Sequence, residues 1–190
     1  HQAAAMLEDL EAAVRARAGG FLYGRDDESL EAALGARMRA AGLTLGIAES
    51  CTGGLIGHRI TQIPGSSDYF LGSLVTYADQ AKIELLGVPA AVLAEHGAVS
   101  EETARDMASG ARAALGCDLA LAVTGIAGPG GATEGKPVGL TYVCLTGPQG
   151  VTCEEHRLGG AREAVKWRAC NAALALALRE TERLAGARIE

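Results

Sequence analysis

Residues 44–54 decide how this chain folds, and they read Thr44-Leu45-Gly46-Ile47-Ala48-Glu49-Ser50-Cys51-Thr52-Gly53-Gly54. The apolar half predicts a buried strand that ends at Glu49-Ser50, followed by a helix that begins near Cys51 or Thr52. The first amides of such a helix have no partner within it, so they face the same space as the Ser50 hydroxyl. A hydroxyl beside free N–H groups suits an acyl-transfer nucleophile, although the commoner role of serine at such a position is an ordinary N-cap.

The composition is that of one medium globular domain with a short appendage. Of the 190 residues, 48% are hydrophobic and 4% are aromatic, so we expect a core of aliphatic side chains and close Gly/Ala contacts. Seventeen basic and 23 acidic residues give a formal charge of −6, with no Lys/Arg run interleaved with aromatics. We therefore expect no direct binding to nucleic acid.

The five cysteines are odd in number, widely spaced and without a C-x-x-C pair. Several fall in apolar, strand-like runs where a free thiol packs as a small hydrophobe, which favours a reducing cytoplasm. There is no signal-peptide pattern and no apolar run near about 18 residues, so we expect neither export nor a membrane span. The first residue is His1 instead of Met, which favours a piece of a longer protein.

Periodicity and turn residues predict alternating helices and strands. The strands are expected near residues 44–49, 70–77, 118–124, 140–145 and 151–157, and the helices near 2–17, 29–41, 51–61, 78–86, 90–95, 100–115 and 161–184. Ser29 and Ser100 are predicted N-caps. Strands separated by helices predict an α/β fold with three α/β/α layers around a mixed, mainly parallel sheet that carries an antiparallel edge hairpin.

Two loops of small residues follow predicted strands, at Glu49–Gly54 and at Thr124–Gly131. Ligands of open α/β sheets bind outside the carboxyl ends of the strands, where both loops are expected. Neither loop matches G-x-G-x-x-G or the Walker pattern, so a dinucleotide or triphosphate site is not supported. Free amides and glycine can still hold one phosphate or an oxyanion, whereas a plain tight connection fits the second loop as well.

A serine nucleophile needs a base, and Lys82 is the best candidate. His58, His96 and His156 lie in a helix, beside a turn and in an edge strand, and no metal-ligand spacing is present. Lys82 begins a short helix directly after a strand, where desolvation and the positive helix end both favour a neutral amine. A solvated surface lysine is the alternative at this position.

Several blocks in order resemble the CinA family over about residues 28–183. They are Ala48–Gly54, Ile63-Pro64-Gly65-Ser66-Ser67, Val75–Lys82, His96-Gly97-Ala98-Val99-Ser100, Thr124–Gly131 and Lys136-Pro137-Val138-Gly139. The resemblance implies a nicotinamide-nucleotide amidase, which hydrolyses the carboxamide of nicotinamide mononucleotide (NMN) to the acid nucleotide and ammonia. It implies no metal and no cofactor.

Carried over by position, the resemblance places the nucleophile at Ser50 and the base at Lys82, with Tyr77 relaying a proton or orienting Lys82. The amides of residues 51–53 are candidate oxyanion donors. The candidate substrate-binding residues are Cys51, Thr52, Gly53, Gly54, Ser66, Ser67, Thr124, Gly125, Gly128, Gly130, Gly131, Lys136 and Arg162.

The same resemblance divides the chain into an N-terminal helical appendage at residues 1–24, the tail of a preceding domain, and an amidase domain at residues 25–190. We expect a homo-oligomer that binds a small nucleotide, and no membrane partner. A non-catalytic partner module in competence or DNA-damage response is the alternative function. A third possibility makes Cys51 the nucleophile, because helix N-termini lower thiol pKa values.

Overall fold

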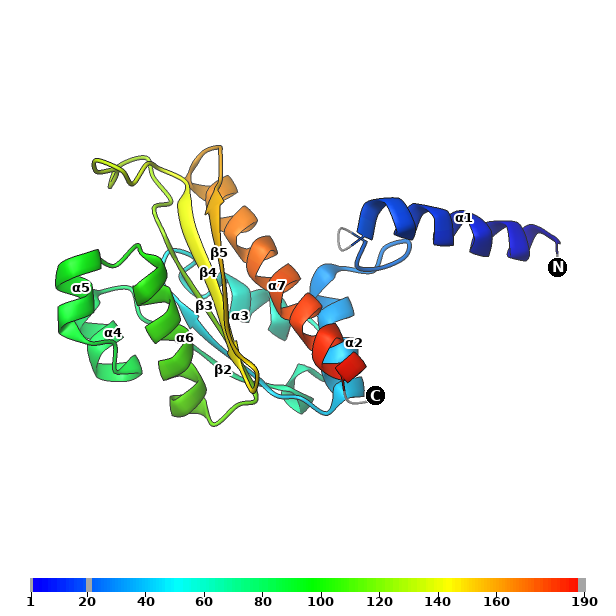
Figure 1. Cartoon of the computed structure of the whole chain (residues 1–190), viewed down its shortest axis with the longest axis horizontal. Helices are drawn as coiled ribbons and strands as arrows, with labels where there is room; N and C mark the ends of the chain where they lie inside the picture. The colour runs from blue at the N-terminus through cyan, green and yellow to red at the C-terminus, as the bar shows by residue number, and fades with distance from the viewer. Residues whose placement is uncertain (1, 20–21, 188–190) are drawn as a thin grey trace.

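The computed structural model describes residues 2–19 and 22–187. Its centre is a five-stranded sheet in the order β2-β1-β3-β4-β5, with β1 parallel to β2 and β3, and with antiparallel β3–β4 and β4–β5 pairs (Figure 1). The strands are β1 (Leu45–Glu49), β2 (Phe70–Val75), β3 (Leu119–Gly125), β4 (Leu140–Gly147) and β5 (Gly150–Arg157). The predicted mixed sheet with an antiparallel edge hairpin is confirmed.

Helices cover both faces of this sheet, which confirms the three-layer prediction (Figure 1). One face carries α2 (Leu30–Ala41), α3 (Leu55–Thr61) and α7 (Arg162–Ala187), and the other carries α4 (Asp79–Leu86), α5 (Ala90–His96) and α6 (Glu101–Leu115). Successive strand residues point to opposite faces, so Ile47 packs toward α2 and α7 whereas Ala48 packs toward α6. No helix in the described part of the chain is long and apolar enough to cross a membrane.

Local sequence signals set most helix boundaries. The hydroxyls of Ser29 and Ser100 accept hydrogen bonds from backbone amides three residues later, so both predicted N-caps are confirmed. Glycines in the left-handed conformation follow the ends of α2, α4 and α6, namely Gly42, Gly87 and Gly116. Strand β2 ends at Val75, two residues earlier than predicted.

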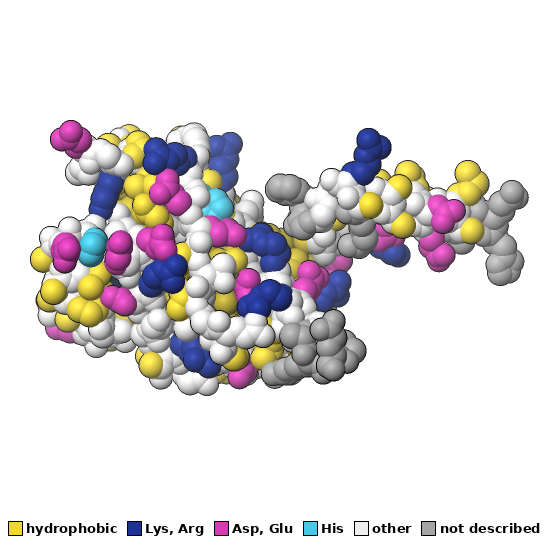
Figure 2. Space-filling view, viewed as in Figure 1, with side chains coloured by type: hydrophobic (Ala, Val, Ile, Leu, Met, Phe, Trp, Pro, Cys, Tyr) yellow, Lys and Arg dark blue, Asp and Glu magenta, His cyan; other side chains and the backbone are white. Residues whose placement is uncertain are grey.

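Helix α1 (Gln2–Ala18) lies apart from the three layers, and apolar side chains are spread along it (Figures 1 and 2). The exposed fractions of Met6, Leu7 and Leu10 are 68%, 66% and 59%. The helix predicted for residues 2–17 is therefore present, with an apolar surface that faces solvent.

The sequence favoured free, buried cysteines, and for two of the five this expectation is wrong. Cys144 and Cys153 face each other across the β4–β5 ladder and form a disulfide. Their pairing depends on the register of two strands, which cysteine spacing does not reveal. The other three cysteines, Cys51, Cys117 and Cys170, are free and buried as predicted.

Candidate active site

The carboxyl ends of three neighbouring parallel strands, β2, β1 and β3, form one edge of the sheet. Ser50 follows β1, the middle strand of the three. The Ser50 amide donates to the Val123 carbonyl of β3 at 3.0 Å, and the Thr76 amide donates to the Glu49 carbonyl of β1 at 2.8 Å. Ser50 is 8% exposed, and its hydroxyl makes no hydrogen bond with any residue that the structure describes. The hydroxyl therefore lies at the ligand-binding edge of an α/β sheet without a structural partner.

The segment after Ser50 differs from the predicted helix. Helix α3 begins at Leu55 with Gly54 as its N-cap, so the predicted start at Cys51 or Thr52 is wrong. Residues 51–54 instead form a turn, in which two successive glycines have positive φ angles of 64° and 95°. Ser50 is not a helix cap, which removes the ordinary explanation for a serine at this position.

The Glu49 carboxylate explains why the helix starts late. This side chain is fully buried, and it accepts hydrogen bonds from the amides of Gly54, Ile56 and Gly57 at 2.9, 3.1 and 2.9 Å. It also accepts one from the Ser73 hydroxyl of β2 at 2.8 Å. The carboxylate thus satisfies the first turn of α3 and fixes the position of the Ser50 turn against β2.

Two amides of the turn remain as candidate oxyanion donors. The Gly53 amide, one of the three predicted donors, donates instead to the Ser50 carbonyl at 3.1 Å, and the Gly54 amide donates to Glu49. The Cys51 and Thr52 amides donate to no backbone carbonyl within residues 2–19 and 22–187. The Thr52 hydroxyl is buried and has no hydrogen-bond partner in the same residues.

The same two amides affect the pKa of the Cys51 thiol. Burial raises the pKa of the Cys51 thiol to about 11, while the Cys51 and Thr52 amides act in the opposite direction by stabilising a thiolate. Both amides therefore lie close to the Cys51 sulfur, and their role as oxyanion donors stays a prediction. The thiol itself is 6% exposed and protonated at neutral pH, which argues against Cys51 as the nucleophile.

Lys82 lies in α4 and its side chain is buried. The amine donates a hydrogen bond to the Tyr77 carbonyl at 3.1 Å and lies 3.6 Å from Asp79 Oδ1. Burial lowers the pKa of Lys82, and the charges of Asp79, Cys51 and Tyr77 act in the opposite direction. Cys51 and Lys82 also interact electrostatically, and the two residues follow neighbouring parallel strands that end at the same edge of the sheet. Lys82 is thus not a solvated surface lysine, and its surroundings favour the neutral form that a general base requires.

Arg162 connects two of the predicted site segments. Its guanidinium donates to the Gly128 carbonyl at 2.8 Å and to the Tyr77 hydroxyl at 3.2 Å. The first turn of α7 therefore lies beside the end of β2 and the glycine-rich loop after β3. Arg162, Tyr77 and Gly128 are brought together at this edge.

Lys166 lies one turn further along α7 and was not predicted from the sequence. Its amine is 3.7 Å from the position that a Cβ atom on Gly53 would occupy, and its charge acts on the Cys51 thiol. Neither Arg162 nor Lys166 forms an ion pair with a carboxylate among the described residues. The only signal in the sequence was the four-residue spacing from Arg162, which places both side chains on one helix face.

The other residues predicted to bind substrate, in the glycine-rich loop after β3 and at Lys136, either make structural contacts or lie in solvent. The Thr124 hydroxyl donates to the Ala98 carbonyl at 2.7 Å, and the Lys136 amine donates to the His96 carbonyl. Gly125 belongs to β3, where a Cβ would approach Thr141 Oγ1 to 2.6 Å, so glycine is needed for close strand packing. Gly130 and Gly131 are exposed at the tip of the loop.

Ser66 and Ser67 are not brought to this edge within one chain. They form the short 3₁₀ helix Ser66–Asp68, which precedes β2, and the next residue, Tyr69, pairs with Leu45 at the start of β1. The catalytic candidates follow the carboxyl ends of these same strands. Because β1 and β2 are parallel, the two serines lie at the opposite edge of the sheet, which sequence proximity to β2 could not reveal.

Comparison with known proteins now identifies the family. The profile of the CinA C-terminal domain matches residues 27–181. This chain belongs to the CinA family. A putative competence-damage inducible protein of Moorella thermoacetica is 51% identical over 88% of the chain and 40% of its own length. A CinA-like protein of Geobacter metallireducens is 51% identical over 85% of the chain and 39% of its own length. The CinA domain thus spans about two fifths of the length of these curated relatives.

Solved structures share the same fold. The competence/damage inducible protein CihA from Agrobacterium tumefaciens is 40% identical with a TM-score of 0.77, and the alignment covers 83% of this chain and 98% of that one. A CinA superfamily protein from Klebsiella pneumoniae is 31% identical with a TM-score of 0.79, over 81% and 96% of the two chains.

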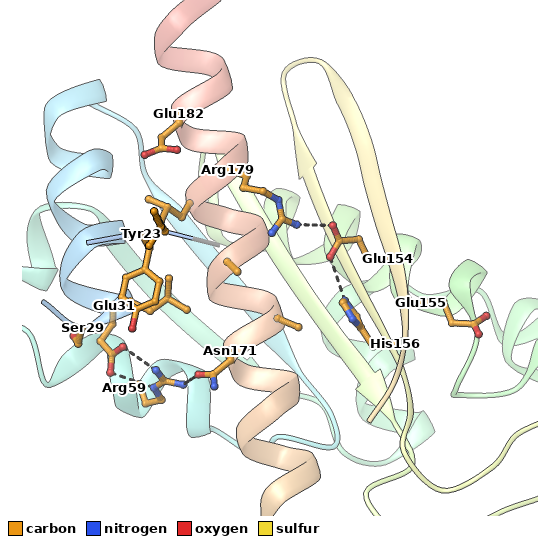
Figure 3. A pocket seen from close by; sticks show the side chains of 15 residues that line it. Tyr23, Ser29, Glu31, Arg59, Glu154, Glu155, His156, Asn171, Arg179 and Glu182 are labelled. Carbon is orange, nitrogen blue, oxygen red and sulfur yellow. Dashed lines mark hydrogen bonds and ion pairs between the residues drawn. The ribbon is translucent and has the colours of Figure 1, made fainter. Parts of the chain in front are cut away.

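A separate cavity of about 1060 Å³ opens on the CinA domain between α2, α7 and β5 (Figure 3). Its polar side chains bind one another: Glu154 bridges Arg179 and His156, and Glu31 pairs with Arg59. None of the sequence-predicted catalytic or substrate-binding residues lines it. We therefore locate the candidate active site at the Ser50 edge and not in this cavity. The described residues contain no group of three or more His, Cys, Asp or Glu side chains that could hold a metal.

The role of Glu49 gives a stability prediction. Glu49→Gln replaces one acceptor oxygen with an NH₂ group, which leaves buried amides or the Ser73 hydroxyl unsatisfied. We expect the free energy of unfolding to fall by about 2–4 kcal/mol, measured by urea denaturation. The exposed Glu155→Gln variant is the control and should change it by less than about 0.5 kcal/mol. An unchanged unfolding midpoint for Glu49→Gln would contradict the assigned contacts.

Proposed function

We propose that this CinA domain, residues 25–190, is an amidase that hydrolyses the carboxamide of NMN to nicotinic acid mononucleotide and ammonia. The observation that carries the proposal is the position of Lys82. A buried amine whose pKa is lowered follows β2 at the same edge of the sheet as a serine hydroxyl that has no hydrogen-bond partner among the described residues. Serine with a neutral lysine is sufficient for acyl transfer without a metal. The substrate is an intracellular nucleotide, which fits a cytoplasmic enzyme.

The proposed reaction begins with attack of Ser50 Oγ on the carboxamide carbon while neutral Lys82 takes the hydroxyl proton. The Cys51 and Thr52 amides hold the negative oxygen of the tetrahedral intermediate. Lys82 then gives its proton to the leaving nitrogen, and ammonia departs as the acyl-enzyme ester forms. Water attacks the ester with Lys82 again as base, which releases the acid and restores the Ser50 hydroxyl.

Tyr77 positions the base and the substrate end of the site. Its carbonyl accepts the hydrogen bond of the Lys82 amine, and its hydroxyl accepts one from Arg162. In this proposal Tyr77 orients Lys82 through its backbone and connects the base to the cationic face of α7. The Lys82 amine can accept a proton from Ser50 only when it is neutral. A neutral amine can still donate the hydrogen bond to the Tyr77 carbonyl, so this contact orients Lys82 in either protonation state.

Arg162 and Lys166 are the proposed phosphate contacts. They lie one helical turn apart beside the Ser50 turn, without carboxylate partners among the residues described, and α7 begins there. A nucleotide phosphate would neutralise both charges at the positive end of a long helix.

Removal of Lys166 should weaken binding of the phosphate and spare the chemistry. For Lys166→Met we expect KM for NMN to rise about tenfold with kcat within about twofold, because one charged contact to phosphate is lost. Arg183→Met, on the exposed far end of α7, is the control and should leave both constants unchanged. A fall in kcat at constant KM would instead place Lys166 in the chemical step.

Asp79 should set the pH at which the enzyme becomes active. Activity needs neutral Lys82, so kcat/KM should rise with pH as the Lys82 ammonium loses its proton. The Asp79 carboxylate favours the ammonium form and raises the pKa of Lys82. Asp79→Asn should therefore move the rising limb of the kcat/KM profile to lower pH. Glu84→Gln on the same helix should leave the limb in place, and a limb that moves to higher pH with Asp79→Asn would contradict this assignment.

The direct test is product analysis. The purified domain should release ammonia and nicotinic acid mononucleotide from NMN in equal amounts, and turn over nicotinamide riboside, which lacks the phosphate, much more slowly. No turnover by folded protein would reject the proposal.

The exposed apolar side chains of α1 favour a second candidate function, a partner module in competence or damage response, with residues 1–24 as an appendage. A partner that is lost on deletion of residues 1–24, together with absent amidase activity, would support that alternative.

A further inference from the structure

We propose that the hydroxyl of Thr76 relays the proton from Ser50 to Lys82. In this arrangement the Ser50 hydroxyl donates to Thr76 Oγ1, and the Thr76 hydroxyl donates to the neutral Lys82 amine. The proposal rests on the proposed function for the identity of the nucleophile and the base. It adds a third side chain to this pair, at a position that was not predicted from the sequence.

The Thr76 side chain is buried without a hydrogen-bond partner. Its exposed fraction is 0%, and Thr76 Oγ1 bonds to no other residue that the structure describes. Thr52 and Tyr69 are the other described residues with a buried, unpaired hydroxyl. Buried polar atoms without a partner destabilise a fold and are rare in native proteins, so each one needs an explanation, of which a catalytic role is one. Tyr69 precedes β2 at the opposite edge of the sheet, whereas Thr76 follows β2 at the Ser50 edge.

Thr76 lies beside Ser50 in the parallel ladder of β1 and β2. Glu49 pairs with Val75 in that ladder, and the Thr76 amide donates to the Glu49 carbonyl at 2.8 Å. Both observations place Thr76 opposite Ser50, because an amide in a parallel ladder bonds to the residue before its partner. Neighbouring strands lie about 4.8 Å apart, so the two residues are adjacent across the ladder.

Both hydroxyls turn to the same face of the sheet. Successive strand residues alternate between faces, and Ala48 and Leu74 pack in the cluster that includes residues of α4 and α6. Ser50 and Thr76 each follow two residues later, so their side chains turn to this face as well. The intervening Glu49 carboxylate binds the first turn of α3 on the opposite face, as alternation requires.

Lys82 approaches the same face from α4. Its side chain is buried, and its amine donates to the carbonyl of Tyr77, the residue that follows Thr76. The amine is therefore anchored one residue along the chain from the proposed relay. The Tyr77 hydroxyl accepts from Arg162 instead, and Tyr77 is 60% exposed, so Thr76 is the hydroxyl placed to connect Ser50 with the buried amine.

A threonine hydroxyl suits this transfer because it donates one hydrogen bond and also accepts. As the Ser50 oxygen bonds to the carboxamide carbon, its proton moves to Thr76 Oγ1 while the Thr76 proton moves to the Lys82 nitrogen. Thr76 ends neutral with a new proton, and Lys82 becomes the ammonium that later protonates the leaving nitrogen. A protonated Lys82 has no lone pair to accept from Thr76, so the contact forms only once the amine is neutral.

Thr76→Val separates an effect on activity from an effect on stability. Valine has a similar shape without the hydroxyl, so kcat/KM for NMN should fall about a hundredfold, whereas Thr76→Ser should stay within about tenfold of the wild-type chain. The unfolding temperature of Thr76→Val should equal or exceed that of the wild-type chain, because a buried unpaired hydroxyl is removed. Thr181→Val is the control, since that hydroxyl is bonded to the Ala177 carbonyl in α7, and it should leave kcat/KM unchanged.

Two results would overturn the relay at this stage. A Thr76→Val chain with wild-type activity would show that the hydroxyl is not used. A Thr76→Val chain that loses stability together with activity would show that Thr76 supports the fold and not the proton transfer.

The number of protons that move distinguishes a relay from a residue that only orients Ser50. We expect kcat/KM, measured in mixtures of H₂O and D₂O, to depend quadratically on the deuterium fraction in the wild-type chain, because two hydroxyl protons move together. In Thr76→Val the dependence should be linear, because one proton moves directly. A linear dependence in the wild-type chain would contradict the relay.

Labelling with an organic fluorophosphonate tests the relay without NMN. The Ser50 oxygen bonds to phosphorus and fluoride leaves, while the Ser50 proton passes to Lys82. The wild-type chain should be labelled at Ser50 about a hundredfold faster than Thr76→Val. In a Lys82→Met background, Thr76→Val should cause no further decrease, because both residues act in one path.

The labelling result separates this proposal from the proposed function. Equal labelling of the wild-type chain and Thr76→Val, or no labelling of Ser50 at all, would overturn the relay even if NMN turnover were established. Labelling that depends on Thr76 in a chain that does not turn over NMN would reject the function and support the relay.

Discussion

Ser50→Ala is expected to lower kcat for NMN about ten-thousand-fold while leaving the fold intact. The hydroxyl attacks the carboxamide in the proposed mechanism, and loss of a serine nucleophile costs at least this factor even when the oxyanion donors and binding contacts remain. Stability should not fall, because the hydroxyl makes no hydrogen bond within the described residues. Ammonia release and thermal unfolding of the same preparation measure both effects.

Cys51→Ala is the comparison for this variant. It removes the neighbouring side chain while keeping the backbone amide, so activity should stay within about tenfold of the wild-type chain. A thiol whose pKa is raised to about 11 by burial is a poor nucleophile at neutral pH. The opposite ranking, with Ser50→Ala active and Cys51→Ala inactive, would transfer the nucleophile to the thiol.

Lys82→Met should lower kcat/KM about a thousand-fold, because a general base contributes factors of this order. Methionine is similar in length and apolar, so it fits the buried site without an ionised group. We expect circular dichroism and the unfolding temperature to remain close to those of the wild-type chain. Retained activity would show that another group removes the proton from Ser50.

Lys82→Arg separates a base from a positive charge. Arginine stays protonated at all accessible pH values, so it cannot accept a proton. If Lys82 acts as the base, the arginine variant should be as inactive as Lys82→Met across the whole pH range. Substantial activity with arginine would mean that the site needs only a cation at this position.

The fold was largely predictable because strand periodicity and caps are local signals. The apolar run at residues 118–124 predicted the strand that became β3, and Ser29 and Ser100 marked helix starts. The start of α3 was not predictable in this way. It depends on the Glu49 side chain, which reaches across to three amides of α3 and to Ser73 of a neighbouring strand.

The candidate site was predictable where its parts follow strand ends. Ser50 and Tyr77 follow the ends of adjacent parallel strands, so topology brings both to one edge of the sheet, and Lys82 lies in the first turn of the next helix. Lys166 was missed because α7 reaches the Ser50 turn through tertiary packing. Ser66 and Ser67 were placed in the site by the family resemblance, although chain direction carries them to the far edge within one chain.

A structure of the Ser50→Ala variant with NMN bound tests the central claim most directly. We expect the carboxamide carbon to lie about 3–3.5 Å from the position of the missing hydroxyl. The carboxamide oxygen should approach the Cys51 and Thr52 amides to about 3 Å, with the phosphate beside Arg162 and Lys166. NMN bound in the cavity between α7 and β5, or bound at the Ser50 edge with its carboxamide turned away from position 50, would contradict the account.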